Sequence, residues 1–171
     1  MSEDFTHRLP LGQIRDGDRV DLVADETECR AIAKRLGLPS IDRLEAHAVL
    51  ERKGEQVRAA GRLKSRLAQS CVATGEPLPA QVDEPFELLF VPEPGGAEED
   101  VELGENDLDV VFHDGAGIEL GTAIADTLML SLDPYPRGPN ADEALKAAGV
   151  LSEEQAGPFA ALAALKGKMG E

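Results

Sequence analysis

Residues 41–71 read IDRLEAHAVLERKGEQVRAAGRLKSRLAQSC, and this stretch decides the fold. Apolar and polar side chains alternate along both halves, and Lys53-Gly54 separates the halves. A period of two is typical of a strand with one buried face, and a short glycine-containing break between two such runs is typical of a hairpin. The pattern therefore predicts strands at 41–52 and 55–71, with the inward residues Leu44, Ala46, Ala48, Leu50, Val57, Ala59, Gly61, Leu63 and Leu67.

The same register places Cys71 on the inward face, although Ser65 and Gln69 also fall there and interrupt the apolar pattern. Cys71-Val-Ala-Thr74-Gly-Glu-Pro resembles half of a C-x-x-C metal knuckle, with threonine where the second thiolate would be. A reactive thiol needs a basic or helix-N-terminal environment, and the sequence that follows is acidic. We predict that Cys71 is a reduced, partly buried residue at a strand end, followed by a turn that needs no metal.

Four basic residues of the second strand share its outward face: Arg58, Arg62, Lys64 and Arg66. Alternate residues of a strand stand about 6–7 Å apart, near the spacing of phosphates along one nucleic-acid strand. These four residues are the candidate RNA-binding surface.

Shorter patterns predict the other elements. We expect strands at 5–11, 19–23, 80–91 and 108–112, and helices at 25–36, 119–132 and 141–147. Asp25-Glu-Thr-Glu28 has the spacing of a capping box. The predicted fold is α+β: an antiparallel sheet of five or six strands, open or curled into a partial barrel, with helices 25–36 and 119–132 packed on it. We expect a core domain at 1–139 and a helical C-terminal appendage at 140–171.

Two segments have no assigned place in this core. Residues 92–106 are acidic and aperiodic, so we expect a mobile loop. The tail at 158–166 is apolar, and its Phe159, Leu162 and Leu165 are candidates to dock on the domain or on a partner.

The charge of the chain is concentrated in its middle. The 171 residues carry a net charge of −16, and residues 67–136 hold sixteen of the 33 acidic residues and no lysine or arginine. Such a field repels nucleic acid and attracts basic partners, although it also serves solubility alone. The candidate sites for a basic partner are Asp107, Asp109, Glu98, Glu99 and Asp100.

The expected compartment is the cytoplasm. No apolar run approaches the roughly 20 residues that span a bilayer. The N-terminus MSEDFTHRL is unlike a signal peptide, and two cysteines make no disulfide framework.

Patterns typical of catalysis are missing from the sequence. The three histidines are far apart, and there is no P-loop, zinc-binding pair or nucleophile elbow. We predict no enzyme activity, catalytic residue, cofactor, metal or small-molecule substrate. Two alternatives stay open: a metal-dependent RNA-processing enzyme using Asp107 and Asp109, and a generic protein-interaction scaffold.

Several stretches in fixed order resemble the YceD family of large ribosomal RNA subunit accumulation proteins. They are the hairpin ending in Ser-Cys71-Val-Ala-Thr-Gly-Glu-Pro, then DVVFHDG (109–115), IELGTAIADTL (118–128), LDPYPR (132–137) and PFAALAALK (158–166). Many family members carry C-x-x-C at the knuckle, and this chain departs from that pattern at Thr74.

The resemblance implies a role in accumulating or processing large-subunit (23S-type) ribosomal RNA in the bacterial cytoplasm. It transfers no catalytic residues. The expected partner is a basic ribosomal protein shielded by the acidic middle, or large-subunit pre-rRNA bound by the basic residues, and the charge layout favours the protein.

Overall fold

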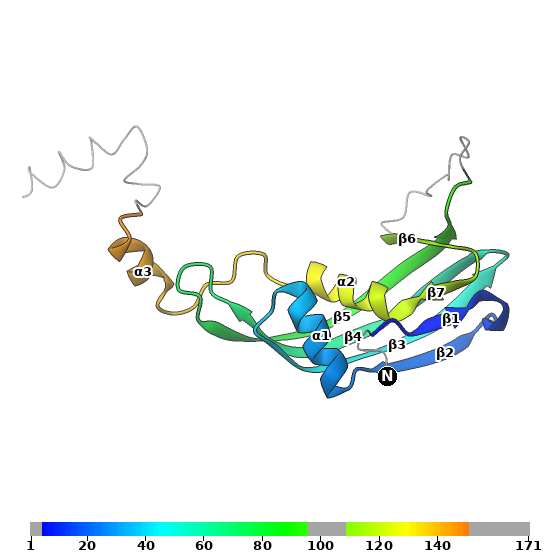
Figure 1. The fold of residues 1–171 in the computed structure, drawn as a ribbon, viewed down its shortest axis with the longest axis horizontal. Helices are drawn as coiled ribbons and strands as arrows, with labels where there is room; N and C mark the ends of the chain where they lie inside the picture. Colours follow the sequence, from blue (N-terminus) through cyan, green and yellow to red (C-terminus); the bar gives the residue numbers. More distant parts are fainter. Residues whose placement is uncertain (1–4, 96–108, 151–171) are drawn as a thin grey trace, which may run out of the picture. The chain divides into compact units, whose positions relative to one another are not determined.

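The predicted hairpin forms. The computed structural model describes residues 5–95 and 109–150, and its hairpin strands are β3 (Ser40–Lys53) and β4 (Gln56–Ser70) (Figure 1). They pair antiparallel, from Ser40 opposite Ala68 to Lys53 opposite Gln56. All but one of the inward residues named from the sequence are buried, and Gly61 is half-buried.

One irregularity in the hairpin explains a break in the alternation of β3. The register shifts between Ile41 and Arg43, so that Asp42 is an extra residue on this strand. Both Asp42 and Arg43 are exposed, whereas Ile41 and Leu44 are buried. The bulge therefore lets two inward residues stand three positions apart instead of two.

Five strands form the main sheet, in the order β2-β3-β4-β5-β6. β2 (Asp18–Val23) is antiparallel to β3, and β5 (Pro77–Pro92) lies beside β4. Ion pairs join Arg58 to Glu87 and Arg62 to Asp83. Arg62 follows Arg58 in β4, whereas its partner Asp83 precedes Glu87 in β5, so the two strands run antiparallel.

The prediction of a wholly antiparallel sheet is wrong at its last strand. β6 (Asp109–His113) pairs parallel to β5, with Leu88 opposite Asp109 and Pro92 opposite His113. A parallel neighbour requires a connection of about a dozen residues or more, and residues 93–108 are long enough. The sheet is therefore mixed. It is also open rather than a barrel, since its end strands β2 and β6 do not pair.

The predicted N-terminal strand belongs to a second sheet, which has two strands. β1 (Arg8–Pro10) is shorter than expected because Leu11–Gln13 turn into a 3-10 helix. It pairs antiparallel with β7 (Gly117–Glu119), which the sequence analysis did not predict.

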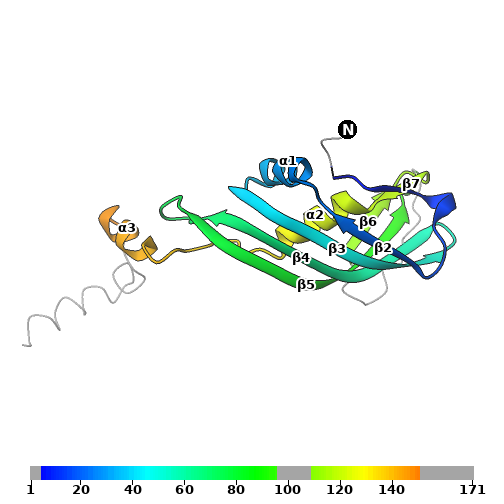
Figure 2. The ribbon, with the colours of Figure 1, turned by 90° about the horizontal axis from the view of Figure 1, so that it is seen from below.

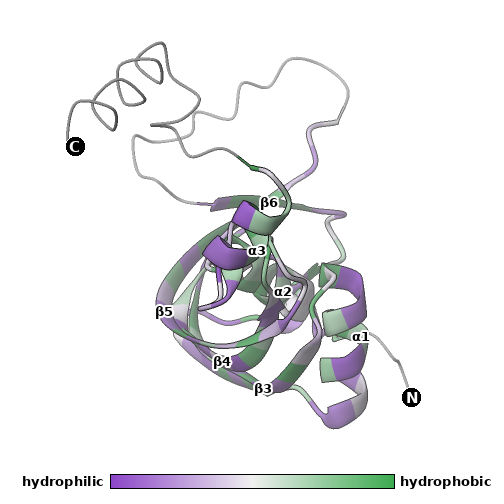
Figure 3. Ribbon diagram, turned by 90° about the vertical axis from the view of Figure 1, so that its left-hand side faces the viewer, coloured by the Kyte–Doolittle hydropathy of each residue, from purple (hydrophilic) through white to green (hydrophobic). Residues whose placement is uncertain are grey.

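Two helices lie on the apolar side of the main sheet. α1 (Glu26–Leu36) begins with the predicted capping box, in which Asp25 and Glu28 each accept a hydrogen bond from the other's backbone N–H. α2 (Leu120–Leu130) is nearly all apolar, and β3, β4 and β5 curve around it, with α1 alongside (Figure 3). Figure 2 shows both helices on the same side of the strands.

The core fills the space between the sheet and these helices. Leu44, Leu63 and Phe90 from the strands and Ile124 and Leu128 from α2 have no exposed surface. The two polar residues that interrupt the inward pattern are hydrogen-bonded: Ser65 donates to the Arg43 carbonyl at 2.9 Å, and Gln69 donates to the Asp133 carbonyl at 2.9 Å. Their burial therefore leaves no polar group unsatisfied.

The described chain divides into two compact units. The first comprises residues up to 69 together with 79–134, and the second comprises 70–78 together with the chain from 135 onward. The second contains the turn that follows β4 and the predicted helix α3 (Ala141–Ala147).

The hairpin depends on a glycine. A Cβ built on Gly61 of β4 would lie 1.8 Å from the carbonyl oxygen of His47 in β3, well inside the contact distance of the two atoms. We expect Gly61→Ala to lower the free energy of unfolding by about 3 kcal/mol, because the strands must move apart along a buried seam.

Urea denaturation measures this change, with Gly12→Ala as the control. A Cβ at Gly12 would meet nothing within 4 Å, so that variant should stay within about 0.5 kcal/mol of the parent. Equal stabilities of the two variants would contradict the predicted constraint.

Candidate functional site

The basic residues predicted to bind RNA lie together on the outward face of β4, but acids from both neighbouring strands pair with two of them. Arg58 binds Glu51 of β3 at 2.7 Å and Glu87 of β5 at 2.5 Å. Arg62 forms an ion pair with Asp83 of β5. The hydrogen bonds to Glu87 and Glu51 raise the pKa of Arg58, and Arg58 in turn lowers the pKa of Glu87.

Lys64 and Arg66 differ from these two. Both are exposed, and their side chains make no hydrogen bond or ion pair with any described residue. Arg66 stands opposite Arg43, which binds Glu45 of its own strand at 2.6 Å. Two of the four predicted RNA contacts are therefore available without breaking an existing ion pair.

Most of the acidic residues predicted to bind a basic partner lie outside the described residues: Glu98, Glu99, Asp100 and Asp107. Asp109 is described, and it is exposed at the first position of β6. The tail residues Phe159, Leu162 and Leu165 also lie outside the described residues.

Three acids that the sequence analysis did not single out meet beside β6. Asp114, Glu119 and Asp126 line a hollow of about 180 Å³, together with Arg8 and the strand residues Val111 and Phe112. They come from the end of β6, from β7 and from α2, so only the tertiary fold brings them together. The sequence carried one signal for the site, which is that all three belong to the segment without lysine or arginine.

Arg8 organises two of these carboxylates. It binds Asp114 at 2.7 Å and Glu119 at 3.2 Å. The Arg8 hydrogen bond, followed by one from the Ala116 amide, lowers the pKa of Asp114 to about 2. Asp126 is bound from outside the hollow by Arg35 at 3.2 Å. Three carboxyl groups thus meet two guanidinium groups, so acidic side chains outnumber basic ones around the hollow.

Both ring nitrogens of His113 are engaged by backbone groups. His113 is buried; its Nδ1 accepts from the Gly115 amide at 3.0 Å and its Nε2 contacts the Glu55 carbonyl at 2.7 Å. An Nδ1 that accepts is unprotonated, so Nε2 carries the hydrogen donated to Glu55. These contacts tie β6 to the turn of the hairpin.

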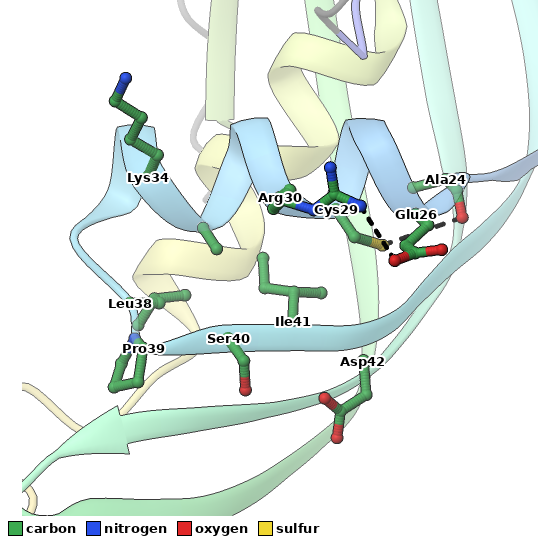
Figure 4. A pocket seen from close by; sticks show the side chains of 11 residues that line it. Ala24, Glu26, Cys29, Arg30, Lys34, Leu38, Pro39, Ser40, Ile41 and Asp42 are labelled. Carbon is green, nitrogen blue, oxygen red and sulfur yellow. Dashed lines mark hydrogen bonds and ion pairs between the residues drawn. The ribbon is translucent and has the colours of Figure 1, made fainter.

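A second hollow, of about 620 Å³, lies between α1 and the start of β3 (Figure 4). Leu38 and Ile41 point into it, and the ion pair between Arg30 and Glu26 lies at its rim. The Cys29 thiol is buried and donates weakly to the Ala24 carbonyl at 3.8 Å. Burial raises the pKa of this thiol, so it is protonated at neutral pH and is no nucleophile.

Cys71 directly follows β4 and is buried, which is more than the partial burial that was predicted. Its amide donates to the Glu76 carbonyl at 2.8 Å, and its carbonyl accepts from the Gly75 amide at 2.8 Å, so the turn closes without a second cysteine. Both cysteines are free.

The thiolate of Cys71 is favoured by hydrogen bonds, although the sequence that follows it is acidic. A hydrogen bond from the Thr74 side chain, and then one from the Gly138 amide at 3.4 Å, lower the pKa of Cys71 to about 7. Neutral donors therefore do what a basic environment would otherwise do. Sequence reasoning considered only charges and overlooked Thr74 as a donor.

Within the described residues, no three histidine, cysteine or acidic side chains gather in a way that would hold a metal ion. In the same part of the chain, no helix is both long and apolar enough to cross a bilayer.

The lowered pKa of the Cys71 thiol can be tested by titration. Following ultraviolet thiolate absorbance against pH, we expect a transition near pH 7 that Cys71→Ser removes and Cys29→Ser retains. Thr74→Val keeps the side-chain shape but loses the donor, so it should move the transition to higher pH, whereas Thr74→Ser should not.

The sign of the accompanying stability change also follows. Because the folded pKa lies below the usual value of 9.0, this thiol contributes stability above about pH 9 that is lost as the pH falls through 7. A transition that stays near pH 9 in the native parent chain would contradict the assignment.

One comparison with known proteins gives a match. The model of a family described as "Large ribosomal RNA subunit accumulation protein YceD" matches residues 59–166, from the middle of β4 through the C-terminal tail. No curated protein and no solved structure matches the chain at a significant level. The match covers more than half of the sequence and includes the knuckle, β6, α2 and the proline-rich connector, so the chain belongs to the YceD family.

Proposed function

We propose that this protein promotes the accumulation of large-subunit ribosomal RNA in the cytoplasm as a non-catalytic factor that binds a basic ribosomal protein. The family description supports a role connected with this RNA. The partner and mechanism are inferred from the distribution of charge.

The observation that carries the proposal is the neutralised outward face of β4. Arg58 and Arg62 are held by Glu51, Glu87 and Asp83, so a phosphate would have to displace a carboxylate to reach either guanidinium. Affinity for nucleic acid grows with the number of phosphates neutralised, and two unpaired cations give weak binding at physiological salt.

The acidic segment has the opposite property. Residues 67–136 supply sixteen carboxylates and no lysine or arginine, and the bases that offset Asp114, Glu119 and Asp126 come from outside that segment. A basic protein meeting this surface is steered by long-range attraction. Shielding such a protein until it reaches ribosomal RNA is a task that needs no catalytic residue.

Two sets of substitutions separate protein binding from RNA binding. The acid set changes Glu98 and Glu99 to Gln and Asp100, Asp107 and Asp109 to Asn. The base set changes Lys64 and Arg66 to Glu, which leaves the ion pairs of Arg58 and Arg62 in place. The control for the base set is a variant with Lys53→Glu and Lys34→Glu. It reverses the same number of positive charges at two sites away from the predicted contacts.

We expect the acid set to weaken the capture of basic ribosomal proteins from lysate by about tenfold at low salt, mainly through a slower association rate. The base set should change that capture by less than about twofold, a difference of under 0.5 kcal/mol. Affinity purification with quantitative mass spectrometry measures both, and large-subunit ribosomal RNA is quantified in cells that carry each set.

The opposite pattern would overturn the proposal. If the base set alone removes co-purified RNA and lowers large-subunit RNA in cells, the protein acts through direct RNA contact. If the purified chain degrades or trims pre-rRNA, and Asp107→Asn with Asp109→Asn abolishes that activity, it is an enzyme.

A further inference from the structure

The edges of the main sheet are protected to different degrees. At one edge, β2 carries Asp18, Arg19 and Asp21 among its six residues. Between Pro77 and Glu87, β5 extends beyond its pairing with β6 and contains three prolines, which cannot donate to an added strand. Charges and prolines are the usual means of preventing unwanted strand pairing.

β6 is less protected, because it contains no proline and its one acidic residue, Asp109, stands at its first position. Its sequence is Asp109-Val-Val-Phe-His113, with no proline, no lysine or arginine and three apolar residues in succession. It is the last strand of the sheet, and within the described chain it pairs with no strand other than β5.

The backbone direction of β6 follows from one hydrogen bond. The His113 carbonyl accepts from the Glu93 amide at 3.0 Å, so this residue directs its main-chain groups toward β5. The N–H and C=O of one strand residue point to the same side, and successive residues alternate. Val111 and Asp109 therefore also face β5, whereas Val110 and Phe112 present their N–H and C=O groups to the free edge.

The side chains beside this edge favour a particular kind of occupant. Phe112 is 55% exposed and lines the hollow that also contains Asp114, Glu119 and Asp126. Three carboxylates at this hollow face the single lining guanidinium of Arg8, with Arg35 reaching Asp126 from outside. Next to the unpaired backbone there is thus an apolar contact and an excess of negative charge.

From this arrangement we infer that β6 accepts an extended, lysine-rich segment of a partner protein as an added sixth strand. The segment's main chain pairs with Val110 and Phe112, and its alternate side chains reach the carboxylates and the Phe112 ring. The inference rests on the proposed function, because it specifies how a basic ribosomal protein is held.

Charge decides between this occupant and two others. A second copy of the chain would bring another net charge of −16 to an acidic edge. RNA would bring phosphates to the same carboxylates, and it has no peptide backbone to complete the strand ladder. A basic peptide segment satisfies both the backbone and the charge.

The test uses the full-length protein and a synthetic peptide of alternating lysine and valine. Nuclear magnetic resonance titration should show the largest amide shifts at Val110 and Phe112, whose N–H groups should become protected from exchange. Phe112→Lys places a like charge on the edge and should weaken binding about tenfold, which corresponds to about 1.4 kcal/mol.

Val23→Lys is the matched control, because Val23 is also an exposed apolar residue, 68% exposed, on the opposite edge strand β2. It should change binding by less than about twofold. Thermal unfolding of both variants checks that the protein as a whole remains folded.

A second probe does not alter the protein. The same peptide with N-methylated backbone amides keeps every charge and side chain but cannot donate main-chain hydrogen bonds. Loss of at least tenfold in affinity supports strand addition, and equal affinity overturns it in favour of attraction between charges alone.

The remaining outcomes are also decisive. Three outcomes would each overturn the inference. The amide shifts could centre on β2, or Phe112→Lys could bind the peptide as well as the parent does. Alternatively, a single-stranded RNA could bind at β6, and more tightly to Phe112→Lys than to the parent. Cells give a separate result. If the level of large-subunit RNA is reduced in cells without the protein but normal in cells with Phe112→Lys, strand addition is rejected and the proposed function is left intact. Normal RNA in cells without the protein rejects the proposed function, while the peptide titration still decides what β6 binds.

Discussion

The register between β3 and β4 is the constraint on which the rest of the structure depends. A slip of one residue would move Leu44, Leu50, Leu63 and their neighbours from the core to the solvent, because the side-chain period of a strand is two. Gly61 lets the backbones approach where Ala48 faces it, and the Asp42 bulge restores the phase at the end of the hairpin. Once this register is set, the inward face is apolar enough to bind α1 and α2, and the sheet curves around α2.

The same register determines the electrostatics of the other face. Glu51 stands opposite Arg58 across the hairpin, and β5 brings Glu87 and Asp83 to the other side of the β4 arginines. Cross-strand pairs of this kind add little to stability when they are exposed, but they occupy the cations. A stripe that reads as basic along one strand is therefore close to neutral in the sheet. A charge that is available to a partner is then expected where acidic residues gather and the same segment has no lysine or arginine. The residues around β6 meet this condition.

The elements that sequence reasoning placed well are those encoded locally. The hairpin follows from alternation, α1 from the Asp25–Glu28 capping box and the glycine that follows Leu36, and α2 from its continuous apolar composition. The direction of β6 could not be predicted in the same way, because the alternation of side chains is identical for parallel and antiparallel strands. The meeting of Asp114, Glu119 and Asp126 with Arg8 arises only in three dimensions, so no spacing in the sequence could reveal it. The hydrogen bond between Thr74 and Cys71 is different, because the two residues are three positions apart and only the attention to charge kept it from being predicted.

If the protein acts as proposed, it must release its basic partner to ribosomal RNA. Under the proposed function the transfer is a competition between two polyanions for the same lysines. RNA carries a charge on every nucleotide and releases condensed counterions when a basic protein binds, so its attraction exceeds that of scattered carboxylates. Strand addition suits such a transfer, because a five-residue edge offers few hydrogen bonds and gives specificity for an extended basic segment without tight binding. A surface with stronger affinity would hold the ribosomal protein away from its RNA, and one without the backbone edge would not distinguish it from any other cation.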